Sequence, residues 1–116
     1  MSNWDVNLYD SLAGPPATDC RYDLLLTYPP PQFMRDREWT LAWAPFVNSF
    51  YIDLIGLDKQ GFIDVIIGTT RVGDTVVDPF CGLSLVGIAA LAIDRKYIGF
   101  DNQQYCIDES TNRLKS

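Results

Sequence analysis

The sequence predicts an α/β protein in which helices flank a small, mainly parallel sheet. Residues 22–27 and 75–77 are apolar without alternation, as strands are when a parallel sheet is covered on both faces. The second half of the chain reads strand, helix, strand, helix, an order that favours a parallel βαβ unit. With 116 residues, 47% of them hydrophobic, the chain has enough apolar material for the core of one domain.

Charge and composition exclude several functions. The formal net charge is -6, with 9 Lys and Arg against 15 Asp and Glu. Because duplex binding depends on cations against phosphate, the chain alone is a poor DNA-binding surface. The chain has no histidine and its 3 cysteines lack metal-ligand spacing, so we expect no metal, no disulfide framework and no histidine-based catalysis. No secretory signal or membrane-spanning run is visible, so we expect a cytoplasmic protein without membrane partners.

Residues 1–19 precede the first predicted strand. Four apolar side chains there could share one side of a short amphipathic segment: Trp4, Leu8, Tyr9 and Leu12. Alternatively, the stretch is a loose N-terminal arm that orders on a partner, and we expect the arm. The strand at residues 22–27 then ends at Tyr28-Pro29-Pro30-Pro31, which cannot join a hydrogen-bonded ladder.

Two helices are expected between residues 43 and 70. Residues 43–56 carry a wide apolar stripe of helical spacing that ends at Gly56, a residue suited to a C-terminal cap. Residues 59–69 form the second, with Phe62, Val65 and Ile66 on one face. The first of these helices would cover the open edge of the strand at 22–27, or present its aromatic residues to a partner. We expect most of these aromatic residues to belong to the ordinary core.

Residues 73–82 contain the first candidate site residue. A turn at Gly73-Asp74 leads into the short strand, Asp78-Pro79 ends it, and a helical apolar pattern begins after Gly82. A further strand at residues 96–100 ends in Asp101, and Asn102 is placed to cap a last helix. Open α/β sheets bind ligands at the carboxyl ends of their strands, and an acid in the position of Asp101 accepts hydrogen bonds from ribose. Otherwise Asp78 is a turn acid and Asp101 a helix-entry acid.

The same residues resemble a known family. The run Asp78-Pro79-Phe80-Cys81-Gly82, followed by residues 96–101 (KYIGFD) and Tyr105-Cys106, is similar to the S-adenosylmethionine-binding half of DNA amino-methyltransferases. The upstream run from Tyr22 to Pro31 falls where that family has a strand ending in Asp-Pro-Pro-Tyr. The order, catalytic block before cofactor block, is that of the subgroup that methylates N4 of cytosine or N6 of adenine.

The resemblance implies a fold, a cofactor and site residues. The fold is a three-layer, Rossmann-like methyltransferase sheet, reduced in size, and the cofactor is S-adenosylmethionine. The cofactor-binding positions are Asp78, Phe80, Gly82, Ser84 and Asp101. The catalytic-motif positions are Tyr28, Pro29, Pro30 and Pro31. The DNA substrate would be reached through a partner subunit, and a protein partner or a homo-oligomer is expected.

The chain also departs from the family pattern. The family's second loop glycine is replaced by Ser84, which would have to adopt a sparsely populated backbone conformation, at a cost on the order of 1–3 kcal/mol. Tyr28 replaces the residue that accepts a hydrogen bond from the target amine, and Pro31 replaces the aromatic residue that stacks on the flipped base. The recognition region between the two blocks is missing.

We therefore expect a single methyltransferase-like domain that is weak or inactive alone. Within it, residues 21–38 would form the catalytic-motif strand and loop, 43–70 the helices, and 73–116 the cofactor-motif βαβα unit. Two alternatives stay open. The chain is a non-catalytic binding or regulatory subunit that completes a partner, or it is a fold-only relative without methyl transfer.

Overall fold

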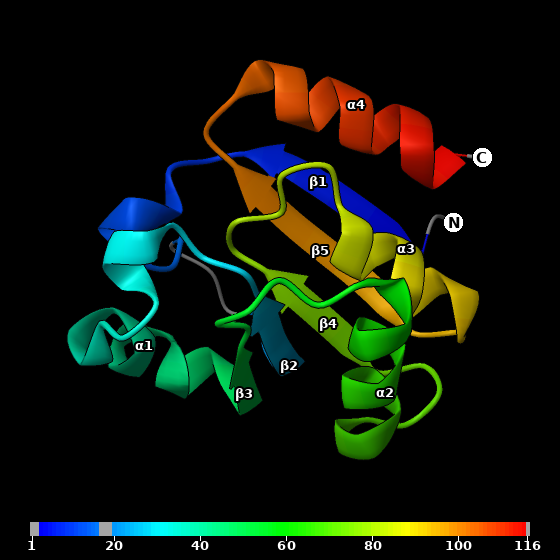
Figure 1. Ribbon diagram of the computed structural model, residues 1–116, viewed down its shortest axis with the longest axis horizontal. Coiled ribbons are helices and arrows are strands. Elements are labelled where there is room, and N and C mark those ends of the chain that lie inside the picture. The colour runs from blue at the N-terminus through cyan, green and yellow to red at the C-terminus, as the bar shows by residue number, and fades with distance from the viewer. Residues whose placement is uncertain (1–2, 17–19, 116) are drawn as a thin grey trace.

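The computed structural model describes residues 3–16 and 20–115. Its centre is a five-stranded, wholly parallel sheet in the order β1-β5-β4-β2-β3 (Figure 1). The strands are β1 (Trp4–Leu8), β2 (Tyr22–Thr27), β3 (Val47–Ile52), β4 (Thr75–Asp78) and β5 (Lys96–Asp101). This arrangement confirms the predicted small parallel sheet.

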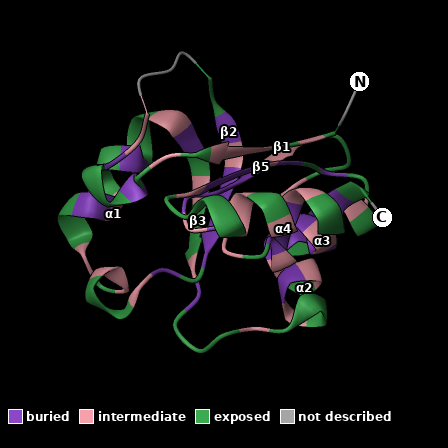
Figure 2. Cartoon of the chain, turned by 90° about the horizontal axis from the view of Figure 1, so that it is seen from above, coloured by how far each residue is buried: buried purple, intermediate pink, exposed green. Residues whose placement is uncertain are grey.

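Helices cover the two faces of the sheet unequally. On one face lie α2 (Lys59–Thr69), α3 (Leu85–Ala92) and α4 (Gln104–Lys115), whereas α1 (Arg37–Trp43) packs on the other (Figure 2). The three short 3-10 helices are η1 (Ser11–Ala13), η2 (Pro31–Phe33) and η3 (Ala44–Phe46). The layers are therefore helix, sheet and helix.

Each face of the sheet has its own core. The first contains Leu24, Leu26 and Val76 of the strands and, from the helices, Phe62, Ile66, Val86, Ala89 and Ala90. The second is aromatic, with Trp39 and Trp43 packed on Leu25, Val77 and Phe100. Strands buried on both faces need apolar residues at successive positions, which explains the non-alternating sequence of β2 and β4.

The β4-α3-β5 unit is held tightly by one buried tyrosine. The ring of Tyr97 fills the space between α3 and β5, where a Cβ added to Gly87 would lie 2.5 Å from Cε2 of that ring. A Cβ added to Gly99 would lie 2.6 Å from its hydroxyl oxygen. Both glycines are therefore required by the approach of this ring and not by backbone conformation.

The prediction of a loose arm at residues 1–19 is wrong for its described part. Residues 4–8 form β1, which pairs with β5 in register from Trp4 opposite Tyr97 to Leu8 opposite Asp101. The alternation of apolar Trp4 and Val6 with polar Asp5 and Asn7 is the signature of a half-buried strand. Residues 1–2 and 17–19 of the predicted arm lie outside the described residues.

The prediction of a helix over residues 43–56 is also wrong. Helix α1 begins after Asp36, whose carboxylate accepts the Trp39 N–H at 2.9 Å, and it ends at Trp43, shortly before Pro45. Residues 47–52 then form β3, which pairs in parallel with β2. The apolar residues fit a helical period, but the open edge of β2 gives this β-branched and aromatic stretch a strand partner, and that contact decides its conformation. A strand, not a helix, covers the edge of β2.

The other expected elements are confirmed. Strands β2, β4 and β5 and helices α2, α3 and α4 lie where the sequence predicted them, within one or two residues. One detail differs at the start of α4. The side chain that accepts the Gln103 N–H is the Asp101 carboxylate, at 2.9 Å, and not that of the expected Asn102.

Candidate functional site

The carboxyl ends of the parallel strands bring the predicted site residues to one edge of the sheet. Thr27 ends β2 and Tyr28 follows it, Asp78 ends β4 and Asp101 ends β5. Two further segments, which the sequence did not single out, reach the same edge: Tyr9 and Asp10 after β1, and Asp53 after β3. Motifs that are far apart in the chain thus surround one region, as open α/β sheets require.

Asp78 is a buried carboxylate with an unusual protonation equilibrium. Only 2% of it is exposed, and its Oδ1 accepts hydrogen bonds from the Thr27 hydroxyl, at 2.5 Å, and from the Phe80 N–H, at 3.0 Å. Burial raises the pKa of Asp78 to about 7, and the nearby Asp101 adds to the rise, whereas the two hydrogen bonds oppose it. The side chain is therefore partly protonated at neutral pH.

Gly82 leaves its backbone open to the edge of the sheet. Its φ of +53° is left-handed, and a Cβ added there would meet no heavy atom within 4 Å. Its N–H donates to Oδ2 of Asp101 at 3.0 Å. This hydrogen bond connects the loop after β4 to the acid at the end of β5, so the positions of Gly82 and Asp101 depend on each other.

Ser84 has the conformation that the loop demands, but its side chain faces the interior. Its φ of 64° and ψ of 40° place it in the left-handed region, and the residue is fully buried. Its Oγ donates to Oγ of Ser110 at 2.8 Å and accepts from the Tyr97 hydroxyl at 3.1 Å. Ser110 in turn donates to the Gly82 carbonyl at 2.8 Å. The serine therefore braces the loop against α4, and it lines neither cavity described below.

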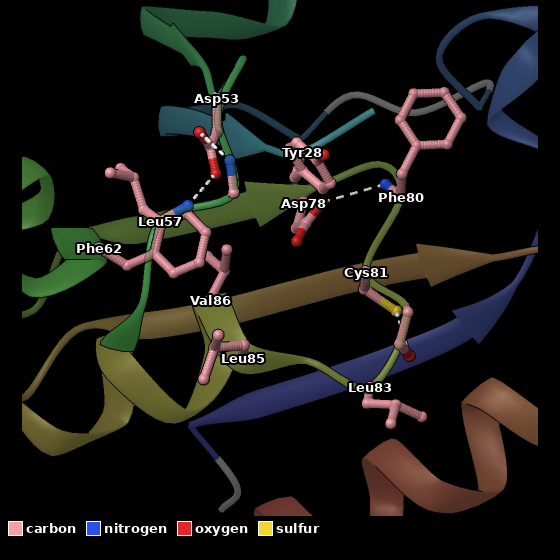
Figure 3. Close-up of a pocket in the computed structure, with 12 residues that line it drawn as sticks. Tyr28, Asp53, Leu57, Phe62, Asp78, Phe80, Cys81, Leu83, Leu85 and Val86 are labelled. Atoms are coloured by element: carbon pink, nitrogen blue, oxygen red, sulfur yellow. Dashed lines mark hydrogen bonds between the residues drawn. The ribbon is translucent and has the colours of Figure 1, made fainter. Parts of the chain in front are cut away.

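Phe80 anchors the loop in the aromatic core. Its ring centroid lies 5.1 Å from that of Trp39 and 6.2 Å from that of Phe33. Figure 3 shows its ring directed away from Val86 and Leu85. Next to it, Cys81 is buried and its N–H donates to the Phe100 carbonyl at 2.8 Å. Burial, followed by the charge of Asp78, raises the pKa of the Cys81 thiol to about 12, so this thiol stays protonated.

The Tyr-Pro-Pro-Pro segment lies beside Asp78. Tyr28 is 49% exposed and lies next to Asp78 at the strand ends (Figure 3). Pro29 is fully buried, Pro30 precedes η2 and Pro31 begins it. Tyr28 thus presents its ring at the surface of the site, whereas the prolines form part of its wall.

Two cavities adjoin along this edge and share Tyr28, Phe80 and Gly82 in their walls. The first, of about 260 Å³, lies over the start of α3 and is also lined by Asp53, Asp78, Phe62 and Leu85 (Figure 3). The second, of about 350 Å³, lies over the ends of β1 and β5 and is also lined by Asp10, Ser11, Pro30, Asp101 and Asn102. Each cavity is lined by two acids, and most of the other residues around the first cavity are apolar.

Asp53 lines the first cavity and was not among the site residues predicted from the sequence. Only 1% of it is exposed. Its Oδ1 accepts the N–H groups of Ile55 and Gly56, both at 3.0 Å, and its Oδ2 accepts that of Leu57 at 2.7 Å. The spacing Asp-x-x-Gly is a turn signal that could have found it. These three bonds hold the loop from β3 to α2 as one wall of the cavity.

The second cavity was also only partly anticipated. Asp10 lies between β1 and η1, within the segment that the sequence assigned to an arm, and its carboxylate accepts the Leu12 N–H at 3.1 Å. Ser11 beside it is buried, and its Oγ has no hydrogen-bond partner among the described residues. Because residues 4–8 were not predicted to form a strand, Asp10 and Ser11 were not expected at the carboxyl edge of the sheet.

Among residues 3–16 and 20–115, no group of three or more His, Cys, Asp or Glu side chains is arranged to hold a metal ion. Within the same described ranges, no helix is both long and apolar enough to cross a membrane.

The chain is similar to known proteins of one class. Residues 63–112 match the model of the N6/N4 family described as DNA methylase. Over 77 residues the chain is 38% identical to the type II methyltransferase M.Cfr9I of Citrobacter freundii, a match that covers 66% of this chain and 25% of that protein. It is 39% identical over 51 residues to the type II methyltransferase M.HinfI of Haemophilus influenzae, a match that covers 44% of this chain and 14% of that protein. The chain thus spans a quarter or less of these relatives.

Solved structures show the same fold. The crystal structure of the M1.HpyAVI–SAM complex superposes with a TM-score of 0.76, covering 96% of this chain and 100% of that one, at 14% identity. Together with the parallel sheet and the cavities at its carboxyl edge, these likenesses define a DNA methyltransferase-like domain of Rossmann-like fold. Within that class, the chain is similar to the DNA methylases of the N6/N4 family.

Proposed function

We propose that this domain binds S-adenosylmethionine along the carboxyl edge of its sheet. The observation that carries the proposal is the hydrogen bond from the Gly82 N–H to Asp101, because it unites the glycine loop and the acid that in this fold faces ribose. The Asp101 carboxylate accepts two backbone N–H bonds and has lone pairs left for two ribose hydroxyls. The solved complex of M1.HpyAVI with SAM supports the same cofactor.

The residues present fit this cofactor. The empty space over Gly82 is a cradle that any Cβ would begin to fill. The cavity at Asp101, of about 350 Å³, would take the nucleoside, and the adjoining one, of about 260 Å³, would take the methionyl end. Asp78 lines the cavity of about 260 Å³ and is placed to accept a hydrogen bond from the α-ammonium group of the methionyl end. When bound, the cofactor supplies a methyl group on a positively charged sulfur.

Calorimetric titration with S-adenosylmethionine tests the proposal. The unmodified chain should release heat on binding, and Asp101→Ala should abolish it. The matched control is Asp108→Ala, which removes an equal charge from the exposed face of α4, outside both cavities. Titration heat that is absent from the unmodified chain, or unchanged in Asp101→Ala, would contradict the proposal.

We further infer that methyl transfer by this chain alone is weak or absent. Tyr28 offers a hydroxyl at the end of a long ring where the target amine needs a short acceptor, and Pro31 cannot stack on a base as an aromatic residue does. Phe33, the nearest aromatic residue along the chain, packs instead against Phe80 and Trp39. Incubation with labelled cofactor and DNA should therefore give no incorporation, and Pro31→Tyr should not restore it.

The DNA substrate is proposed to reach this domain through a second protein. The chain carries a net charge of -6, which opposes binding to phosphate. A partner that supplies cationic surface would remove this obstacle. Filter binding of duplex DNA at about 50 mM salt, where phosphate contacts are strongest, should show no retention by the chain alone; retention would contradict this part of the proposal.

A further inference from the structure

Strand β3 forms an open edge of the sheet. In the order β1-β5-β4-β2-β3 it is the last strand, and its neighbour is β2 (Figure 1). No other described strand pairs with it. The outer row of its backbone N–H and C=O groups is therefore available for a further strand.

This edge lacks the features by which proteins usually prevent edge-to-edge pairing. Such features are charged side chains, prolines and bulges on the strand itself. The six residues of β3, VNSFYI, contain no charge and no proline. Between Pro45 and Leu57 the single charged residue is Asp53, which is buried and accepts three backbone N–H bonds. The nearby Arg21 is tied to the Pro45 carbonyl and to the Asn48 side chain, at 2.6 and 2.7 Å.

Large apolar side chains are exposed on the same segment. Phe50, Tyr51 and Leu54 are each between 36% and 42% exposed, and Ile55 is 80% exposed. We call these four residues the β3 edge surface. Burying them would stabilise an interface, because apolar area would be removed from water.

We propose that the β3 edge surface binds a second copy of this chain, with β3 paired antiparallel to β3 about a two-fold axis. The net charge of -6 makes two copies repel each other, so contact is favoured where the surface carries no charge. A two-fold axis sets the same surface against itself, and an uncharged strand meets no like charge there. The opposite edge, β1, differs because it carries the exposed Asp5.

The pairing would leave the cavity at Asp101 open. Antiparallel pairing joins two five-stranded sheets into one of ten strands, near the upper size of ordinary twisted sheets. The carboxyl edges of the two copies then point in opposite directions. Each copy keeps its own site at Asp101, on the far side of β4 from the interface. The proposed nucleoside end of the cofactor site therefore lies outside the interface, whereas Asp53 and Gly56 of the adjoining cavity flank Leu54 and Ile55 of the β3 edge surface.

Sedimentation equilibrium on the full chain tests the proposal by charge exchange at Phe50. The unmodified chain should have twice the mass of one chain. Phe50→Lys and Phe50→Glu should each be monomeric, because equal charges would meet across the axis. An equimolar mixture of the two variants should regain the double mass. Leu8→Lys, a matched change at an exposed residue of β1, should leave the dimer intact.

Each other result overturns the proposal. A monomeric unmodified chain would show that no second copy binds. Single variants that remain dimeric would place the interface elsewhere. A mixture that stays monomeric, with each variant folded by circular dichroism, would exclude pairing of β3 with itself. Should either single variant fail to fold alone, a Ser49→Lys and Ser49→Glu pair repeats the comparison on the same strand and is read in the same way.

Discussion

The Thr27 hydroxyl donates a hydrogen bond to the carboxylate of Asp78, 51 positions along the chain, and both residues are buried. The bond joins the end of β2, which carries the Tyr-Pro-Pro-Pro segment, to the end of β4, which carries the glycine loop. It opposes the rise in the pKa of Asp78 without cancelling it. The two motif blocks are therefore coupled through a titrating group in the core.

The raised pKa of Asp78 predicts that this residue makes stability fall as pH rises. Burial raises its pKa from 3.8 to about 7 in the folded chain. At pH values between 3.8 and about 7, the Asp78 carboxyl is protonated in the folded state and ionised in the unfolded state. The stabilising contribution of Asp78 to the free energy of unfolding is therefore fully present below pH 3.8. It decreases by at most about 1.4 kcal/mol per pH unit as the pH rises to about 7.

Asp78→Asn tests this pH dependence. Asparagine keeps an oxygen for Thr27 and Phe80 but does not titrate. Urea unfolding of both proteins between about pH 5 and about pH 8 should show the unmodified chain losing stability relative to Asp78→Asn by on the order of 3 kcal/mol. A difference between the two proteins that is constant with pH would contradict the shifted pKa.

Substitutions at Ser84 should measure how much the left-handed backbone conformation of this residue destabilises the folded chain. Ser84→Ala and Ser84→Gly both remove the hydroxyl that contacts Ser110 and Tyr97. Glycine alone relieves the left-handed conformation, whose cost for a residue with a Cβ is about 1–2 kcal/mol. Chemical denaturation should therefore find Ser84→Gly more stable than Ser84→Ala by about 1 kcal/mol. Equal stability of the two variants would mean that the loop relaxes out of this conformation.

Gly87 should not tolerate a methyl group. In Gly87→Ala the new Cβ would overlap the Tyr97 ring, which is enclosed between α3 and β5. Overpacking of this kind costs about 1–3 kcal/mol, more than the gain in helix propensity. The matched control is Gly68→Ala in α2, where a Cβ meets nothing within 4 Å; it should be neutral or stabilising. Thermal unfolding of both variants makes the comparison, and a stabilised Gly87→Ala would contradict the packing of Tyr97.

Local sequence patterns were sufficient for the elements that pack in the middle of the molecule. The apolar runs of β2 and β4, the helical spacing in α2 and α3, and the Asp-Pro and glycine signals after β4 each specify one conformation. They also predicted Asp78 and Asp101 at the edge of the sheet, because parallel strands end on the same side. The left-handed Ser84 followed from its place in the loop pattern.

The two edge strands were decided by tertiary structure. Residues 47–52 carry a pattern that fits a strand or a helix, whereas residues 4–8 alternate but form too short a run to identify alone. Each is a strand because β5 or β2 offers it an unpaired backbone. Asp10, Ser11 and Asp53 follow these two strands and line the cavities, and of the three only Asp53 belongs to a sequence signal, that of a turn. The sequence by itself determined the fold class, the methyltransferase-like motifs and the acids at their ends. Only the folded chain decided which residues surround those acids and which edge of the sheet stays open, because both depend on contacts between segments that are distant along the chain.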